Sequence, residues 1–279
     1  MTNTPPKVMT FSATDPTGGA GLQADLLTLS SLACHPLSIT TAITVQDTVG
    51  VNALMPVDPQ WVNDQARTIL EDTEVSVFKL GLLGSADNIA MVAEIITDYP
   101  DIPLILDPIL ASGRGDELVD SEMIEAMVQL LFPLATLITP NSSEAKKLVS
   151  DGGEETSDIK IDECASRFIN MGSKNILITG THEKTKKVVN TFYSNDGGIK
   201  PFQWERLEGS YHGSGCTLAS AIAGYCAQGF LLEAAVEEGQ YFTWQALKNA
   251  FKAGMGQAIP DRFFWINHKE QDGGRYTHH

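Results

Sequence analysis

The stretch VMTFSATDPTGGAGLQADLL, Val8–Leu27, contains a strand, a turn and the start of a helix in quick succession. The apolar and hydroxyl-bearing residues at 8–13 are typical of a buried strand. The proline and glycines of TDPTGGAG indicate a turn, and the pattern from about Leu22 to Ala33 predicts a helix. A strand that passes through a glycine-rich turn into a helix is the unit from which parallel sheets are built. This opening therefore predicts an α/β fold.

The same alternation of β-rich and helical runs continues along the chain. It predicts a three-layer sandwich in which helices flank a mainly parallel central sheet. No repeat and no long polar linker occurs, so we expect one domain over residues 1–279, with a C-terminal tail over about 262–279 whose aromatic residues dock on the body before the chain frays. The acidic segment Asp151–Glu163 is expected to be a solvated loop that enters a helix. The further expected strands are Leu37–Val45, Val51–Val57, Val75–Leu83, Pro103–Asp107, Thr136–Thr139 and Asn175–Gly180, with a hairpin over Val188–Gly198, and the further helices include Gln60–Glu71, Asn88–Asp98, Cys216–Gln228 and Glu233–Lys252.

Composition excludes several classes of partner. The 279 residues carry a formal net charge of −16, whereas nucleic-acid binding requires a basic face. No apolar run of about 18 residues or more occurs, so no membrane-spanning segment is predicted. The N-terminus MTNTPPKVMTFSATD lacks the basic start and apolar centre of a signal peptide, which favours a cytoplasmic location. The cysteines and histidines show no metal-binding spacing.

Two segments place acidic and amide side chains after predicted strands. Asp107 ends a strand and precedes Pro108, so its carboxylate is expected at the sheet edge where α/β folds bind ligands. Mg²⁺ takes one or two such carboxylates, although an Asp-Pro turn explains the residue equally well. Asn141 and Glu144 begin a helix. They can cap that helix, and they can also face whatever occupies the strand end.

A second glycine-containing turn lies in YHGSGCTLASAIAG, Tyr211–Gly224, before another predicted helix. Such a turn presents backbone N–H groups and the positive end of the helix dipole, which suits the γ-phosphate of a nucleotide. Cys216 stands at the mouth of the helix, where the dipole is expected to lower the pKa of its thiol. Three roles compete for it: a covalent nucleophile, a packing residue, or a weak general base beside a bound anion.

Five motifs, taken in order, resemble those of the hydroxymethylpyrimidine/phosphomethylpyrimidine kinases of thiamin biosynthesis, within the ribokinase superfamily. They are TDPTGGAGLQADL, AITVQDTVGV, DP, TPNSSEA and HGSGCTLASAIA. The resemblance runs from about Val8 to Gln228. It implies a ribokinase-like fold, usually in a homodimer, with ATP and a pyrimidine in neighbouring pockets.

The resemblance also implies roles for individual residues. Asp25 and Gln46 match the residues that hydrogen-bond the amino group and ring nitrogens of the pyrimidine. Asp107 and Glu144 match the metal positions, and Asn141 a phosphate position. The pyrimidine pocket would further be lined by Ala13, Ala20, Thr44, Leu82 and Ile109, and the anion hole would comprise Gly213, Ser214, Gly215 and Cys216, the last at the position of a catalytic Asp in most of the superfamily.

Three positions depart from the usual pattern of the family. Ala13 replaces a Gly, which adds a methyl group at the floor of the pyrimidine pocket. Thr179 replaces a Lys near the phosphates of ATP. The loop ASGRGDE, Ala111–Glu117, carries Arg114, which we expect to supply the missing positive charge.

The implied activity is ATP- and Mg²⁺-dependent phosphorylation of 4-amino-5-hydroxymethyl-2-methylpyrimidine and of its monophosphate, with a role for K⁺ left open. Two alternatives stay open. One is a pyridoxal kinase, although Asp25 and Gln46 favour an aminopyrimidine because they offer donors and acceptors to an amidine-like edge. The other is a catalytically impaired paralogue that binds the pyrimidine as a sensor, which the replacement of Lys by Thr179 would suit.

Overall fold

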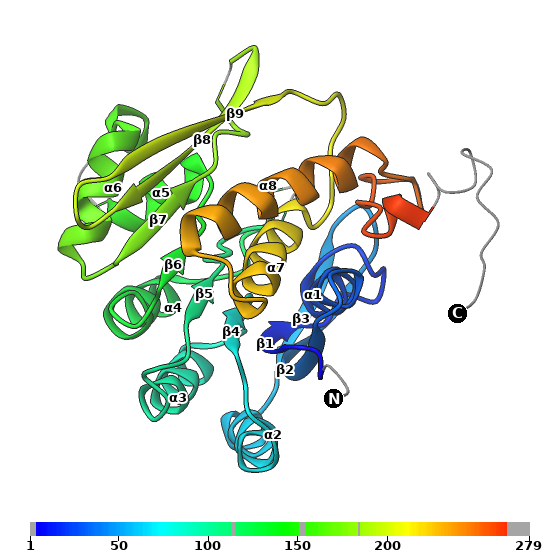
Figure 1. The fold of residues 1–279 in the computed structure, drawn as a ribbon, viewed down its shortest axis with the longest axis vertical. Helices are drawn as coiled ribbons and strands as arrows, with labels where there is room; N and C mark the ends of the chain where they lie inside the picture. Colours follow the sequence, from blue (N-terminus) through cyan, green and yellow to red (C-terminus); the bar gives the residue numbers. More distant parts are fainter. Residues whose placement is uncertain (1–3, 113–114, 151–154, 184, 267–279) are drawn as a thin grey trace.

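The computed structural model describes residues 4–112, 115–150, 155–183 and 185–266, which form a sheet with helices on both faces (Figure 1). The strands are β1 (Lys7–Ala13), β2 (His35–Gln46), β3 (Val51–Pro56), β4 (Val77–Leu80), β5 (Leu104–Leu106), β6 (Leu137–Ile138), β7 (Asn175–Ile178), β8 (Lys187–Ser194) and β9 (Ile199–Glu205). The helices are α1 (Gly21–Ser31), α2 (Pro59–Asp72), α3 (Ala86–Thr97), α4 (Ser121–Ala126) with the π-helical turn η1 (Met127–Leu131), α5 (Ser142–Val149), the 3₁₀ turn η2 (Thr156–Asp158), α6 (Ile161–Asn170), α7 (Ser214–Ala227) and α8 (Leu232–Lys248).

The sheet has nine strands in the order β3-β2-β1-β4-β5-β6-β7-β8-β9. The strands from β2 to β7 in this order run parallel. At one edge β3 pairs antiparallel with β2, and at the other β8 pairs antiparallel with both β7 and β9. The carboxyl ends of the parallel strands therefore meet at one edge of the sheet, where α/β folds bind ligands. The predicted, mainly parallel α/β architecture is confirmed.

Successive residues of the central strands are buried on opposite faces of the sheet. Met9 and Phe78 lie in a core with α2 to α6, whereas Val8 and Val77 lie in a second core with α1, α7 and α8. Burial on both faces explains why these strands appear in the sequence as nearly continuous apolar runs. Two cores on either side of one sheet confirm the predicted three layers.

The structure extends the sequence prediction at two places. The helical segment formed by α4 and η1 was not predicted, although its buried residues Met123, Met127 and Leu131 recur every four residues. Asp120 caps it by accepting from Met123 N at 2.9 Å. The hairpin predicted over Val188–Gly198 extends further in the structure, because β9 continues to Glu205, which pairs with Lys187 at the start of β8. The acidic segment leads into α6 as expected, with residues 151–154 outside the described part of the chain.

The C-terminal region packs against the body of the protein beyond residue 262. Arg262 is 2% exposed, and the ring centroid of Phe264 lies 5.6 Å from that of Phe242 in α8. Phe264 therefore docks on the body as expected, and residues 267–279 lie outside the described residues. Throughout the described ranges, every helix is too short or too polar to cross a bilayer.

Candidate active site

Two glycine-containing segments interlock at the carboxyl edge of the sheet. One is the loop after β1, residues 14–20, and the other is the turn before α7, residues 211–213. Gly213 has a φ of +79°, and a Cβ atom there would lie 1.9 Å from the carbonyl oxygen of Gly19. Glycine alone tolerates both the left-handed backbone and so close an approach. The contact brings the glycine loop against the predicted anion-binding turn.

The first turn of α7 opens toward Asp107. A Cβ atom at Gly215 would lie 3.8 Å from each carboxylate oxygen of Asp107, and these are the only described atoms outside its own helix within 4 Å. Space is therefore available next to the backbone N–H groups of Ser214–Cys216, and a carboxylate borders that space.

Asp107 and Glu144 form an acidic pair beside this turn. Burial, and then the charge of Asp107, raise the pKa of Glu144 to about 8. Burial also raises the pKa of Asp107 to about 6, against the opposing charge of Lys79. Within the described residues, the buried Oδ2 atom of Asp107 has no hydrogen-bond partner. At Asp107 burial thus outweighs the favourable charge of Lys79, and both carboxyl groups hold their protons more tightly than free acids do.

This pair fits a divalent metal ion. Mg²⁺ takes one or two protein carboxylates and completes its shell with water and phosphate oxygens. No three His, Cys, Asp or Glu side chains form a complete metal cage in the described part of the chain. Asp107 and Glu144 would therefore supply only part of the shell, which leaves room for phosphate ligands. Their assignment to the metal stays a prediction.

Cys216 is buried, and its thiol hydrogen-bonds Asp107. Burial, and then the negative charge of Asp107, raise the pKa of the thiol to about 12. The expectation that the helix dipole lowers this pKa is therefore wrong, because the loss of solvent and a neighbouring carboxylate outweigh the dipole. A thiol that stays protonated donates to Asp107 and is a poor nucleophile.

Asp25 lies in a buried polar cluster, although the sequence predicted a pyrimidine contact for it. Lys79 Nζ lies 2.8 and 2.9 Å from its two carboxylate oxygens. The hydroxyls of Thr10 and Ser220 donate to the same carboxylate at 2.6 and 2.7 Å. Asp25 is fully buried and hydrogen-bonds protein groups, and its contact with a pyrimidine stays a prediction. The sequence did contain one sign of this buried cluster: the charged Lys79 stands within the otherwise apolar strand VFKL.

Asp15 is a candidate that the sequence analysis missed. Its carboxylate accepts from Thr17 N at 2.8 Å, from Ala20 N at 2.7 Å, and from the side chain of Gln46. It also lies 2.8 Å from Nε2 of His212. Burial acts to raise the pKa of Asp15, but these hydrogen bonds outweigh it and lower the pKa to about 2. Asp15 thus joins the glycine loop to the end of β2 and to the turn before α7.

The other residues predicted to line the pyrimidine pocket lie at the same edge of the sheet. Ala13 N donates to Leu82 O at 2.9 Å, and the hydroxyl of Thr44 donates to Thr14 O at 2.7 Å. Ala13, Thr44 and Leu82 are buried, while Ala20, Gln46 and Ile109 are half-buried. Their contact with a pyrimidine stays a prediction.

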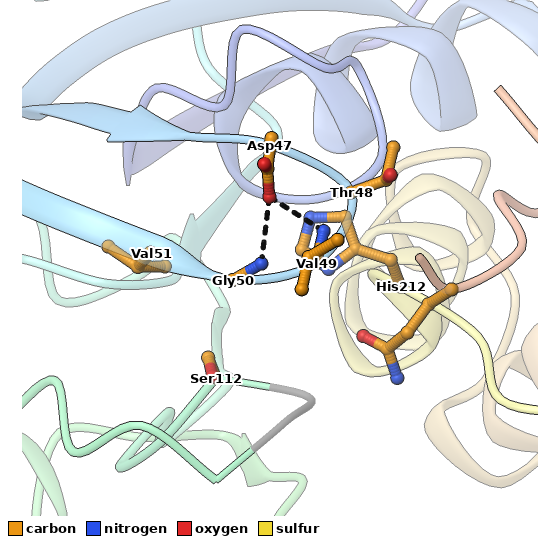
Figure 2. Close-up of a pocket in the computed structure, with 8 residues that line it drawn as sticks. Asp47, Thr48, Val49, Gly50, Val51, Ser112 and His212 are labelled. Atoms are coloured by element: carbon orange, nitrogen blue, oxygen red, sulfur yellow. Dashed lines mark hydrogen bonds between the residues drawn. The ribbon is translucent and has the colours of Figure 1, made fainter. Parts of the chain in front are cut away.

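A small hollow lies between the β2–β3 turn and His212 (Figure 2). It holds about 200 Å³ of empty space, part of it open to solvent. Asp47 shapes the turn by accepting from Val49 N at 2.7 Å and from Gly50 N at 3.0 Å. Ser112 also lines the hollow, which therefore presents an imidazole and a hydroxyl near the end of β2.

Asn141 and Thr179 lie side by side at the ends of β6 and β7, joined by a parallel bridge. Asn141 Oδ1 accepts from Glu144 N, and Glu144 Oε2 accepts from Asn141 N, each at 2.9 Å. The predicted capping of α5 is therefore confirmed, whereas phosphate contacts of Asn141 and Thr179 stay predictions. Arg114 lies outside the described residues, so its expected charge compensation near Thr179 is not addressed by the structure.

Comparison with known proteins places the chain among kinases. Residues 15–261 match the phosphomethylpyrimidine kinase family. The chain is 30% identical over 270 residues to a hydroxymethylpyrimidine/phosphomethylpyrimidine kinase of Staphylococcus aureus, an alignment that covers 96% of this chain and 97% of the relative. The ADP complex of Bacillus subtilis pyridoxal kinase superposes with a TM-score of 0.83 at 26% identity, over 94% of this chain and 99% of the other. The phosphomethylpyrimidine kinase of Clostridium difficile 630 gives a TM-score of 0.74 at 29% identity, over 87% and 99%.

These similarities agree with the geometry of the site. The family match includes both glycine segments, the acidic pair and Cys216, and the structures that share the fold are kinases. The predicted ribokinase-like fold is thereby confirmed. The protein is a kinase, and it belongs to the phosphomethylpyrimidine kinase family.

Proposed function

We propose that the protein, as one kinase domain, uses ATP to phosphorylate 4-amino-5-hydroxymethyl-2-methylpyrimidine and then its monophosphate, in thiamin biosynthesis. The observation that carries the proposal is the open first turn of α7 beside the acidic pair. Phosphoryl transfer needs positioned donors for the charge on the equatorial oxygens and a metal site. Backbone N–H groups and two carboxylates meet both needs. Family membership supports the pyrimidine alcohol as the acceptor.

On the phosphate side, the backbone N–H groups of residues 213–216 would bind the transferred phosphoryl group. Mg²⁺ held by Asp107 and Glu144 would neutralise charge on the phosphate oxygens. Asn141 and Thr179 lie next to Glu144 and would orient the nucleotide phosphates. The ADP complex of the Bacillus subtilis relative supports a nucleotide site on this fold.

On the substrate side, Gln46 would bind the polar edge of the pyrimidine. It is half-buried at the end of β2 and hydrogen-bonds Asp15, which holds its amide in one orientation. Cys216 would act as a donor to Asp107 and a polar neighbour of the reacting hydroxyl, because its raised pKa disfavours both a thiolate base and a covalent intermediate. Direct in-line transfer needs no enzyme nucleophile.

Pyridoxal is the second candidate substrate. The TM-score to the pyridoxal kinase, 0.83, exceeds the 0.74 to the phosphomethylpyrimidine kinase. The buried ion pair of Asp25 with Lys79 also weakens Asp25 as an argument for an aminopyrimidine. Gln46 and the family match still favour the pyrimidine.

We also propose a homodimer that uses the β2–β3 hairpin at the sheet edge. Ile43 and Met55 are paired across the hairpin and are 46% and 59% exposed, and Val45 is 61% exposed. An apolar face on an edge hairpin favours association with a second copy. Val45→Asp should shift the mass measured by light scattering from a dimer to a monomer, whereas an unchanged mass would place the interface elsewhere.

Product analysis tests the proposed activity directly. The protein should be incubated with ATP, Mg²⁺ and, separately, the pyrimidine alcohol, its monophosphate or pyridoxal, and the products identified by mass spectrometry. Coupled ADP release gives the specificity ratio. We expect the monophosphate from the alcohol and the diphosphate from the monophosphate. Preference for pyridoxal would make the protein a pyridoxal kinase, and binding without turnover would support the sensor reading.

A further inference from the structure

The segment after α8, drawn in orange to red in Figure 1, returns to the site edge of the sheet. Ala258 bridges to Tyr211, and its carbonyl oxygen accepts from His212 N at 2.9 Å. Asp261 N donates to Ala246 O of α8 at 3.0 Å. The segment is therefore attached both to the turn before α7 and to α8, and its next residue is Arg262.

Arg262 lies between the glycine loop and the first turn of α7. Its Nη1 and Nη2 atoms donate to Gly18 O at 3.2 Å and to Gly19 O at 2.6 Å. Its Nε atom donates to the hydroxyl of Thr217 at 3.1 Å. The planar guanidinium directs these donors to two segments at once, which a lysine ammonium on one flexible stem does not reproduce.

The groups that Arg262 contacts on both segments are themselves in contact with Gly213. The hydroxyl of Thr217 donates to Gly213 O at 2.8 Å, so Arg262 reaches the start of α7 through one side chain. On the other side, Arg262 holds the Gly19 carbonyl oxygen against which Gly213 packs. The position of Gly213 relative to the glycine loop therefore depends on two groups that Arg262 orients.

Arg262 is also a buried charge without an ionic partner among its hydrogen bonds. Its acceptors in the described residues are two carbonyl oxygens and one hydroxyl. Burial lowers the pKa of the guanidinium to about 10, which still leaves it charged at neutral pH. The charges of Asp25 and Asp15 offset part of this effect without bonding to the guanidinium. Burying a charge without a direct ion pair is costly, and an apolar side chain of similar size fills space at lower cost. Packing alone is therefore a poor reason for an arginine here.

We propose that Arg262 is a positioning residue for the anion-binding turn, which it holds in register with the glycine loop. The inference rests on the proposed phosphoryl transfer and gives Arg262 no contact with nucleotide or substrate. Correct placement of the N–H groups matters most when phosphoryl charge is greatest, so the effect belongs to the transition state. Ground-state binding of ATP and acceptor should change little.

Steady-state kinetics of three variants test this role. Arg262→Gln should lower kcat about 10- to 100-fold while the KM values for ATP and the pyrimidine alcohol change less than about threefold. Arg262→Lys keeps the charge and one donor nitrogen in place of the three of the guanidinium, so it should recover part of the loss. This variant also tests the role if Arg262→Gln fails to fold. Lys252→Gln is the matched control, because it removes an exposed charge from the same segment. It should behave like the wild type.

Hydrogen exchange of the ligand-free protein gives a readout independent of catalysis. Arg262→Gln should speed amide exchange in residues 14–22 and 211–220 and leave β8 and β9 unchanged. Faster exchange throughout the protein, or wild-type exchange together with wild-type kcat, overturns the proposal. If the wild type phosphorylates no pyrimidine, the proposed function fails, while the exchange comparison still decides the role of Arg262.

Discussion

Lys79 Nζ lies 2.8 Å from Asp25 Oδ1, and both side chains are wholly buried. Burial acts to lower the pKa of Lys79, but the adjacent Asp25 outweighs it and raises the pKa. The pair joins α1 to β4, and the hydroxyl of Ser220 extends it to α7. A charge pair therefore lies directly beneath the helix that carries the predicted anion-binding turn.

Asp25→Ala should destabilise the protein by about 3–5 kcal/mol, because it leaves the ammonium of Lys79 buried without a counter-charge. Urea unfolding measures the change. The double variant Asp25→Leu with Lys79→Met removes both charges and should be more stable than Asp25→Ala. If Asp25→Ala keeps wild-type stability and loses only pyrimidine affinity, the substrate contact first predicted for Asp25 is right.

Gly213→Ala should abolish most activity, since the added methyl group would overlap the Gly19 carbonyl oxygen and displace the turn. Gly229→Ala is the matched control: its φ of +90° imposes a similar backbone penalty of about 1–2 kcal/mol, but no described atom lies within 4 Å of the new Cβ. Comparing kcat and melting temperature of both variants separates the overlap from the backbone strain. Equal losses in the two variants would argue against a special role for the Gly213–Gly19 contact.

Cys216 should resist iodoacetamide near neutral pH, because burial and Asp107 raise the pKa of its thiol to about 12. Cys216→Ser keeps a donor to Asp107 and should retain most turnover. Cys216→Ala should lose about 10- to 100-fold, the equivalent of one hydrogen bond to a charged group. Cys226→Ala, in the last turn of the same helix, is the control. A covalent adduct on Cys216 in intact-mass spectra during turnover would refute this account.

The metal-free protein should become less stable as pH rises from about 5 to about 8. The pKa of Asp107 is raised to about 6 and that of Glu144 to about 8, in both cases mainly by burial. An acid whose pKa is higher in the folded than in the unfolded state binds more protons when folded. Its contribution is full below the unfolded pKa and is lost as pH rises through the folded pKa. Urea unfolding across this range, in the presence of a chelator, measures the slope.

Glu144→Gln should flatten that slope, because the amide does not titrate. Saturating Mg²⁺ should also flatten it in the wild type, since the cation replaces the proton between the two carboxylates. The activity of Glu144→Gln should fall and recover in part at high Mg²⁺. Wild-type activity at low Mg²⁺ would leave Glu144 as a capping residue of α5 only.

Gln46→Ala should weaken pyrimidine binding by about 1–3 kcal/mol, because the polar edge of the ligand loses its partner. The affinity for ATP should remain close to that of the wild type. Calorimetric titration with each ligand measures both, and Gln60→Ala, on the exposed face of α2, is the control. Parallel loss of both affinities would indicate a general structural effect instead.

Local sequence patterns were enough to predict the architecture. The spacing of apolar residues reflects burial on one face of a sheet or helix, and turn residues mark where an element ends. The predicted strand Val8–Ala13 therefore lies within one residue of the observed Lys7–Ala13, and the helix predicted after Asn141 is observed at Ser142–Val149. Glycines in a turn before a helix have a local cause as well, which is why the turn at Gly213 was located from the sequence, while its role in anion binding stays a prediction. The helical segment of α4 and η1 was missed, although its buried residues recur every four residues.

The partners of charged side chains depended on the order of the strands, which no local pattern contains. Lys79 meets Asp25, 54 residues away, because β4 pairs with β1 and α1 packs on β1. His212 meets Asp15 across 197 residues, and Arg262 meets Gly19 across 243. Burial in the assembled fold also raises the pKa of the Cys216 thiol, whereas its place at a helix start led us to expect a lowered pKa. Composition and motif order indicate which groups are present, but burial and distance set their charge states and contacts, and both arise only when the sheet assembles.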